Sequence, residues 1–145
     1  MVKVLFKRLN PKVKLPKYKT NGSSGMDLMA FIDESIKIKP QESVLIPTGI
    51  SIAIPENTEI QIRPRSGLAA KSNISVLNTP GTIDSDYRGE IKIIIFNHGK
   101  KEFTVNNNDR VAQMVLMPIL KGELEETNNL PETIRGKGGF GSTGK

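Results

Sequence analysis

Short apolar runs separated by turn residues constrain the fold of this chain more than any other feature. Two runs, SIKIK and EIQIR, alternate between polar and apolar side chains, which is the period of a strand with one buried face. Pro, Gly and Asn fill the gaps, and only residues 66–72, SGLAAKS, favour a helical turn. The runs occupy residues 2–9, 35–39, 43–46, 50–54, 59–63, 74–77, 90–96 and 111–119. This pattern predicts an all-β sandwich or barrel.

Composition limits the cellular context and the number of domains. The chain has 145 residues with 37% hydrophobic content, which suits one domain with a packed core. It contains no Cys, so disulfides and thiolate chemistry are excluded and a reducing compartment is favoured. No apolar run has the length of a signal peptide or a membrane span. We therefore expect a cytoplasmic protein with no membrane partner.

The N-terminal region is strongly basic. The first nineteen residues contain seven Lys or Arg and no acidic residue, within a chain of net charge +6. Such a stretch either attracts an anionic partner or forms a solvated edge that keeps the protein soluble. The sequence contains no nucleic-acid-binding motif, and aromatic residues make up only 5%. No stable nucleic-acid partner is expected.

Two of the predicted strands are apolar on both faces. They are IKIIIF at 91–96 and VAQMVLMPI at 111–119. A strand of a small isolated sandwich buries only one face. These two are therefore expected to lie between sheets or in a subunit interface.

Several polar residues stand where chemistry is possible. Asp84 and Asp86, two residues apart in DSDYRG, would project to one face of an extended strand, and a carboxylate there suits a general base or a metal-bound water. The alternative is a simple hairpin turn. Arg65 and Ser66 open SGLAAKS, where backbone amides would suit a phosphate; the alternative is a turn capped by Ser66.

Three further positions are weaker signals on their own. Asp27 precedes a strand, Gln113 is a polar residue within an apolar strand that must be satisfied by protein, water or ligand, and His98 lies in a surface turn. One His and no Cys exclude a zinc-ligand set. The remaining metal option is Mg²⁺ held mainly by substrate phosphates.

The C-terminal segment RGKGGFGSTGK combines glycines, positive charge, hydroxyls and one ring. It contains G-x-x-x-x-G-K but lacks the following Ser or Thr and helix that a P-loop requires. The composition suits a polyanion that also has a flat face. Because residues 122–134 are polar and rich in turn residues, we expect a core domain at 1–134 and a flexible C-terminal arm at 135–145.

Five segments, in order, resemble the five motifs of the homotrimeric dUTPase family: SSGMDLMA, PRSGLAAK, NTPGTIDSDYRGEI, RVAQMVLMPI and RGKGGFGSTGK. They span residues 23–145, and IDSDYRGE and RGKGGFGSTG are the most specific. The resemblance implies a β jelly roll that assembles as a homotrimer with shared active sites. It also implies Mg²⁺-dependent hydrolysis of dUTP to dUMP and pyrophosphate by water attack at the α-phosphate. Such a reaction limits uracil incorporation into DNA and supplies dUMP for thymidylate synthesis.

The resemblance also assigns roles by position. Asp84 would deprotonate the attacking water, Asp27 would hold the metal through water, and Tyr87 would lie under the deoxyribose and exclude a 2′-hydroxyl. Uracil would be read by Asn78 and the hairpin residues Gly81, Thr82 and Ile83, and stacked on by Phe140. Phosphates would be held by Arg65, Ser66, Gly67, Gln113, Arg135, Gly141, Ser142 and Thr143.

The chain departs from the family pattern at a few positions and leaves other functions to be weighed. Ser24, Met26, Pro80 and Thr82 replace commoner family residues, and they affect the walls of the uracil pocket rather than a proposed chemical group. A dCTP deaminase of the same fold would need a different carboxylate set, and a helical pyrophosphatase does not fit the strand pattern. A catalytically silent regulatory or nucleic-acid-binding protein is disfavoured because Asp84, Arg135 and Phe140 are all present.

Overall fold

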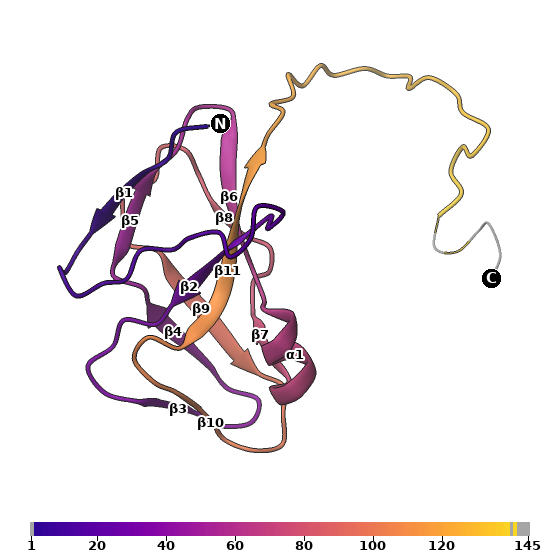
Figure 1. Cartoon of the computed structure of the whole chain (residues 1–145). Helices are drawn as coiled ribbons and strands as arrows, with labels where there is room; N and C mark the ends of the chain where they lie inside the picture. The colour runs from indigo at the N-terminus through magenta and orange to yellow at the C-terminus, as the bar shows by residue number, and fades with distance from the viewer. Residues whose placement is uncertain (1, 140, 142–145) are drawn as a thin grey trace.

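A computed structural model describes residues 2–139 and 141 (Figure 1). These residues form short strands and one helix. The elements are β1 (Leu5–Arg8), β2 (Met26–Met29), β3 (Ile36–Ile38), β4 (Ser43–Pro47), β5 (Ile50–Ala53), β6 (Thr58–Arg63), α1 (Ser66–Ser72), β7 (Ile74–Val76), β8 (Gly81–Ile83), β9 (Lys92–Asn97), β10 (Phe103–Val105) and β11 (Arg110–Pro118).

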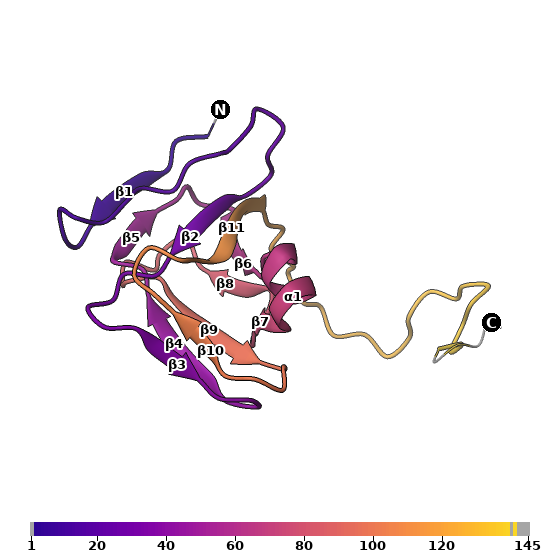
Figure 2. The same ribbon diagram turned by 60° about the horizontal axis from the view of Figure 1, so that its bottom comes forward.

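All strand pairs are antiparallel, and most join strands distant in sequence. The largest sheet has the order β2-β11-β6-β8, a second has the order β4-β9-β7, and β1-β5 and β3-β10 form two-stranded ribbons. The two views show these sheets wrapped around one interior, with α1 at one side (Figures 1 and 2). The predicted all-β jelly roll is confirmed.

Most predicted runs became strands, and residues 66–72 form the helix. Two strands were not predicted, β8 and β10, each of three residues. Neither GTI nor FTV is long enough to show a period, and both form through pairing with distant partners, β6 and β3. Tertiary pairing rather than local pattern defines them.

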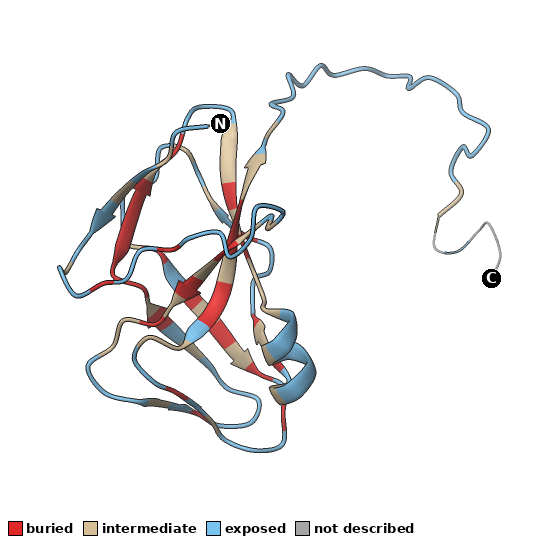
Figure 3. Cartoon of the chain, in the orientation of Figure 1, coloured by how far each residue is buried: buried red, intermediate tan, exposed pale blue. Residues whose placement is uncertain are grey.

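Isoleucine dominates the core. Ile46, Ile60, Ile93 and Ile95 are fully buried, and buried segments of β5, β9 and β11 face the interior in Figure 3. Among the few buried polar residues, Asn97 donates from Nδ2 to the carbonyl oxygens of Ile38 and Lys101 and accepts from Gly99 N–H. The side-chain amide of Asn97 thereby provides hydrogen-bond partners for three backbone groups around the turn after β9.

The outer face of the β4-β9-β7 sheet is apolar as well. Leu45 and Leu77 flank Ile94 in register, and each is 51% exposed. Phe96 lies two residues along on the same face. The prediction of an apolar strand on both faces is therefore confirmed for β9. In β11, four of the nine residues are buried within the chain, and they lie on both faces of the strand.

The chain leaves the body after β11. Ile119 N–H donates to the carbonyl oxygen of Asn57, and residues 120–139 then extend away from the sheets (Figures 1 and 2). Within the described part of this segment, the hydrogen bonds join only its own residues, as between Arg135 Nε and the carbonyl oxygen of Gly138. Residues 2–139 and 141 include no helix long and apolar enough to cross a membrane.

Candidate active site

Antiparallel pairing places several predicted residues in one row across the largest sheet. Asp27 on β2 lies directly opposite Gln113 on β11, and Gln113 lies directly opposite Arg63 on β6. Directly opposed residues point to the same face, with Cβ atoms about 5 Å apart. The register shifts between Arg110 and Ala112, so Arg110 is opposite Met29 and joins the face of Asp27.

Asp27 is the centre of an ion-pair network on this face. Its Oδ1 accepts from Arg65 Nε at 2.9 Å, and its Oδ2 accepts from Arg110 Nη1 at 3.0 Å. Arg65 Nη1 also donates to the carbonyl oxygen of Arg110 at 3.2 Å. Because the side chains of Asp27 and Arg65 are only 17% and 24% exposed, this network holds Arg65 more firmly than a surface pair would. One carboxylate opposes two guanidinium groups, so the network keeps a net positive charge.

Arg65 retains donors for a ligand. A guanidinium has five N–H donors, and the network uses two of them, which leaves three. Arg65 precedes α1 with an extended backbone, and its side chain makes no capping hydrogen bond. Ser66 is the first helical residue, so the alternative in which Ser66 caps this turn is wrong. Ser66 and Gly67 are exposed beside Arg65.

Gln113 is satisfied by the protein. Its Nε2 donates to the carbonyl oxygen of Pro64 at 3.0 Å, directly before Arg65. Gly25 lies beside this amide, and a Cβ added there would be 2.7 Å from Gln113 Oε1. A side chain at position 25 would therefore displace Gln113, so the glycine in SSGMD has a steric reason.

The predicted base lies in a different place. Asp84 follows β8 and begins a turn in which Tyr87 N–H donates to its carbonyl oxygen at 3.2 Å. The structure therefore shows the hairpin turn, and Asp84 and Asp86 do not lie on one face of an extended strand. Asp84 is exposed and lines a cavity of about 290 Å³. The other lining residues are Thr82, Ile83, Tyr87, Glu90 and Lys92.

The hairpin holds its other candidates by internal contacts. Tyr87 donates from its hydroxyl to the carbonyl oxygen of Glu90 at 3.0 Å, which fixes the ring beside the cavity. Asn78 is exposed, and its Nδ2 lies 3.1 Å from where a Cβ on Gly81 would be. The Thr79–Pro80 peptide bond between them is cis. Asn78, Gly81 and the cavity residues therefore form one contiguous hairpin.

Within one chain, β6 separates the hairpin that carries Asp84 from the ion-pair network that contains Arg65. Gly81 pairs with Ile62 and Ile83 with Ile60, so Asp84 lies one step further, level with Glu59. Arg65 lies beyond the opposite end of β6. Six residue steps of extended chain span roughly 20 Å. This distance is too long for Asp84 and Arg65 of the same subunit to act on one phosphate.

The C-terminal candidates and the metal site have fewer observations. Arg135 and Gly141 lie within the described residues, and both are exposed. Phe140, Ser142 and Thr143 lie outside the described residues. No group of three or more His, Asp or Glu that could hold a metal occurs within residues 2–139 and 141. Asp27 uses one acceptor site on each oxygen for the arginines and keeps others for a metal-bound water.

The sequence interpretation missed Arg110. It lies three residues before Gln113, at the exposed start of β11. The charged residue is visible in DRVAQ, but its partner, Asp27, is 83 positions away. Only the register of β2 on β11 brings the two together.

Comparisons with known proteins show the family and the fold of the chain. A family model described as dUTPase matches residues 11–144. The chain is 58% identical to the deoxyuridine 5′-triphosphate nucleotidohydrolase of Clostridium tetani, covering 96% of this chain and 94% of that protein. It is 53% identical to the protein of the same name from Gloeothece citriformis, covering 99% and 97%. A solved structure of the Staphylococcus bacteriophage 80alpha dUTPase with dUpNHpp has the same fold, at a TM-score of 0.89, 23% identity and 99% coverage of both chains. The chain belongs to the dUTPase family.

Proposed function

We propose that this protein hydrolyses dUTP to dUMP and pyrophosphate. The observation that carries the proposal is the pair of complementary half-sites: a carboxylate beside a hairpin cavity, and a positively charged phosphate face centred on Arg65. The relatives from Clostridium tetani and Gloeothece citriformis carry the name of this reaction. The location that follows for such an enzyme is the cytoplasm, where it would limit uracil in DNA and supply dUMP.

In this mechanism, Asp84 accepts a proton from a water molecule. The water oxygen attacks the α-phosphorus, the bond to the bridging oxygen breaks, and pyrophosphate leaves with the bonding electrons. Arg65, with Ser66, Gly67 and Gln113, neutralises and orients the phosphate oxygens as negative charge accumulates. The exposed position of Asp84 beside the cavity gives water access to the carboxylate.

The hairpin would select the base and the sugar. Asn78 and the backbone of Gly81, Thr82 and Ile83 offer hydrogen-bonding groups to the uracil edge. Tyr87, fixed through Glu90, supports the deoxyribose and leaves no room for a 2′-hydroxyl. A polar site built for one pattern of donors discriminates strongly against a base that leaves those groups unpaired.

Mg²⁺ is proposed to enter with the triphosphate. The described carboxylates form no protein-only cage, which suits an ion that keeps most of its water and binds substrate phosphates. Asp27 is the residue that would hold one of its waters. When bound, the ion would supply additional neutralisation of the triphosphate charge.

We further propose a homotrimer whose active sites are shared between subunits. The separation of Asp84 from Arg65 along β6 supports a site that takes its groups from at least two copies of the chain. Two exposed apolar regions offer contacts between copies: the outer face of β4-β9-β7 and the side chains of Leu120, Leu124, Leu130 and Ile134. Exposed apolar side chains gathered on one sheet face support an interface at that face.

The C-terminal arm, residues 135–145, is proposed to close over the bound nucleotide. Arg135 would hold the γ-phosphate with Gly141, Ser142 and Thr143, and Phe140 would stack on uracil. The segment extends from the body and makes no contact with it before residue 139. Ordering by ligand would complete the site only when both a triphosphate and a flat base are present.

The first prediction concerns the substrate. Purified protein with Mg²⁺ should release pyrophosphate from dUTP and not from dCTP, dTTP or UTP. The comparison tests the reaction, the base and the sugar together. Release from several nucleotides would contradict uracil selection, and no release from folded protein would sink the proposed function.

The second prediction concerns the base. Asp84→Asn should lower kcat by about 10²- to 10⁴-fold while the affinity for a non-hydrolysable dUTP analogue stays within a few-fold, because only proton transfer is removed. The matched control is Asp86→Asn, an exposed carboxylate in the same turn. Near-normal turnover of Asp84→Asn would remove this residue from the mechanism.

The third prediction tests the shared site by mixing two inactive variants, Asp84→Asn and Arg65→Gln. After partial denaturation and random reassembly, about a quarter of the sites should combine an intact Asp84 from one subunit with an intact Arg65 from another. Activity should recover to about that fraction of wild type. If both residues acted within one chain, every site would carry a defect and the mixture would stay inactive.

The fourth prediction concerns the arm. Truncation after Ile134 should leave the oligomer size by light scattering and the melting temperature unchanged, because residues 135–139 make no contact with the body. Turnover of dUTP should fall by at least about tenfold, since an arm that closes over the phosphates completes the site. An active truncated protein would disprove the role of the arm as a lid.

A further inference from the structure

The basic N-terminal stretch is folded against the body rather than loose. Val13 is 4% exposed and packs in the core, and Pro16 is buried as well. Val13 N–H donates to the carbonyl oxygen of Asn10, and Thr20 and Ser23 exchange hydrogen bonds in the next turn. These anchors hold Lys14, Lys17 and Lys19 at defined positions with their side chains exposed.

The three lysines line one cavity together with the ion-pair network. This cavity has a volume of about 410 Å³, and its wall includes Lys14, Lys17, Lys19, Asp27 and Arg110. Arg65 lies directly behind it through Asp27. Four cationic side chains of the cavity wall, together with Arg65, therefore surround the single carboxylate of Asp27. This leaves a surplus of four positive charges at the edge of the proposed phosphate site.

This charge is not balanced within the described residues. The only carboxylate in the cavity wall is Asp27, and both of its oxygens already accept from arginines. None of the three lysines forms an ion pair among residues 2–139 and 141. A concave surface with one sign of charge concentrates counter-ions of the opposite sign.

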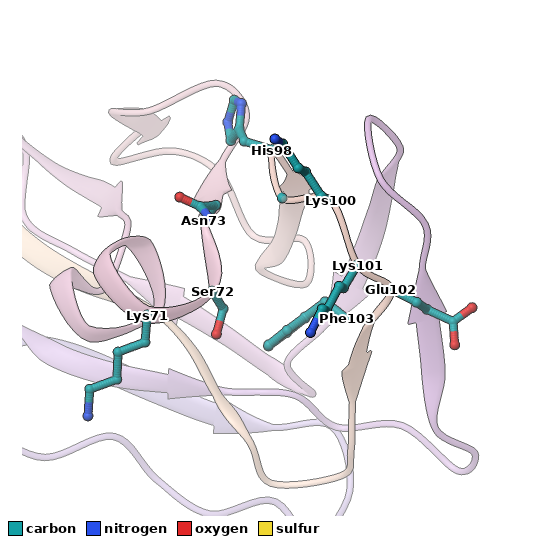
Figure 4. Close-up of a pocket in the computed structure, with 9 residues that line it drawn as sticks. Lys71, Ser72, Asn73, His98, Lys100, Lys101, Glu102 and Phe103 are labelled. Atoms are coloured by element: carbon teal, nitrogen blue, oxygen red, sulfur yellow. The ribbon is translucent and has the colours of Figure 1, made fainter.

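A second lysine-lined hollow gives a contrast. It lies between the end of α1 and the β9–β10 connection, with Lys71, His98, Lys100, Lys101 and Glu102 in its wall (Figure 4). Glu102 supplies negative charge there and pairs with Lys37 at 3.3 Å. No residue of the proposed active site lines it. Its lysines therefore serve as a reference for charge far from the reaction.

We propose that Lys14, Lys17, Lys19 and Arg110 form an accessory subsite for a pyrophosphate group. The cavity is small and concave, which suits a short polyphosphate rather than an extended nucleic-acid backbone. The group is either the terminal part of the bound triphosphate or the released product. The source of this pyrophosphate group rests on the proposed function. The anion site itself does not depend on it.

The test compares two triple variants of the full chain. Lys14→Gln, Lys17→Gln and Lys19→Gln remove charge from the cavity, and Lys39→Gln, Lys100→Gln and Lys101→Gln remove the same charge from exposed positions at the β3–β10 end. Calorimetric titrations with pyrophosphate, and separately with a non-hydrolysable dUTP analogue, are made at low and physiological ionic strength. If the triple variant of the cavity has a lower melting temperature than the wild type, the single variant Lys17→Gln is used in its place.

We expect the cavity variant to weaken pyrophosphate binding about tenfold at low ionic strength, with a smaller salt dependence than wild type, and the control to match wild type. Weakened binding of the analogue alone would assign the subsite to the terminal phosphates of the substrate. Weakened binding of both would assign it to the product as well. Equal losses in both triple variants, or no loss in the cavity variant, would overturn the inference.

The same titrations separate this inference from the proposed function. Pyrophosphate binding that depends on the three lysines, in a protein that does not hydrolyse dUTP, would keep the anion subsite and reject the reaction. Hydrolysis of dUTP by a protein whose pyrophosphate and analogue binding does not depend on these lysines would keep the reaction and reject the subsite. A third titration uses single-stranded DNA. A cavity variant that loses affinity for this DNA but not for pyrophosphate or the analogue would show a nucleic-acid surface instead and overturn the subsite.

Discussion

β6 hydrogen-bonds to β8 on one edge and to β11 on the other, and this arrangement determines where Asp84, Gln113 and Arg65 lie. Antiparallel pairing with β8 carries Asp84 to the start of β6, and the path from β6 into α1 carries Arg65 past its end. Because the extended strand β6 keeps its two ends apart, Asp84 and Arg65 of one chain belong to two separate half-sites. Each half has a distinct chemistry, with proton transfer and base recognition at one end and phosphate binding at the other. The active site proposed above therefore combines groups from at least two subunits.

The phosphate half-site depends on a shared carboxylate. Two guanidinium groups beside each other repel, and Asp27 between them reduces that repulsion while fixing both side chains. Partial burial strengthens these interactions and limits rotation of Arg65. The cost of placing charges in this region is offset by hydrogen bonds to both carboxylate oxygens and to the carbonyl oxygen of Arg110. Arg65 is thereby positioned before a ligand arrives, which lowers the entropy lost on binding.

The sequence predicted much of the fold, because alternation and turn residues are local signals. EIQIR became most of β6, and SGLAAKS became α1. Features that depend on distant register were not visible: β8 and β10 exist through their partners, and Arg110 reaches Asp27 only through the bulge before Ala112. Asp84 was found as a candidate, and its turn was among the conformations that the sequence offered for DSDYRG. The family motifs indicated which residues are candidates for the active site. They did not indicate that Asp84 and Arg65 lie at opposite ends of β6.

The exposed apolar groups and the separated half-sites favour the same conclusion. Leu45, Leu77 and the four aliphatic side chains beyond β11 gain free energy only if another surface covers them, at about 25 cal/mol per Å² of apolar area. A monomer would leave that area in water and would also leave Asp84 without a phosphate half-site. In the proposed oligomer, association would both cover apolar side chains and bring Asp84 to the Arg65 of another copy, so stability and activity would both depend on it. The proposal therefore implies that a monomer would lack a complete site.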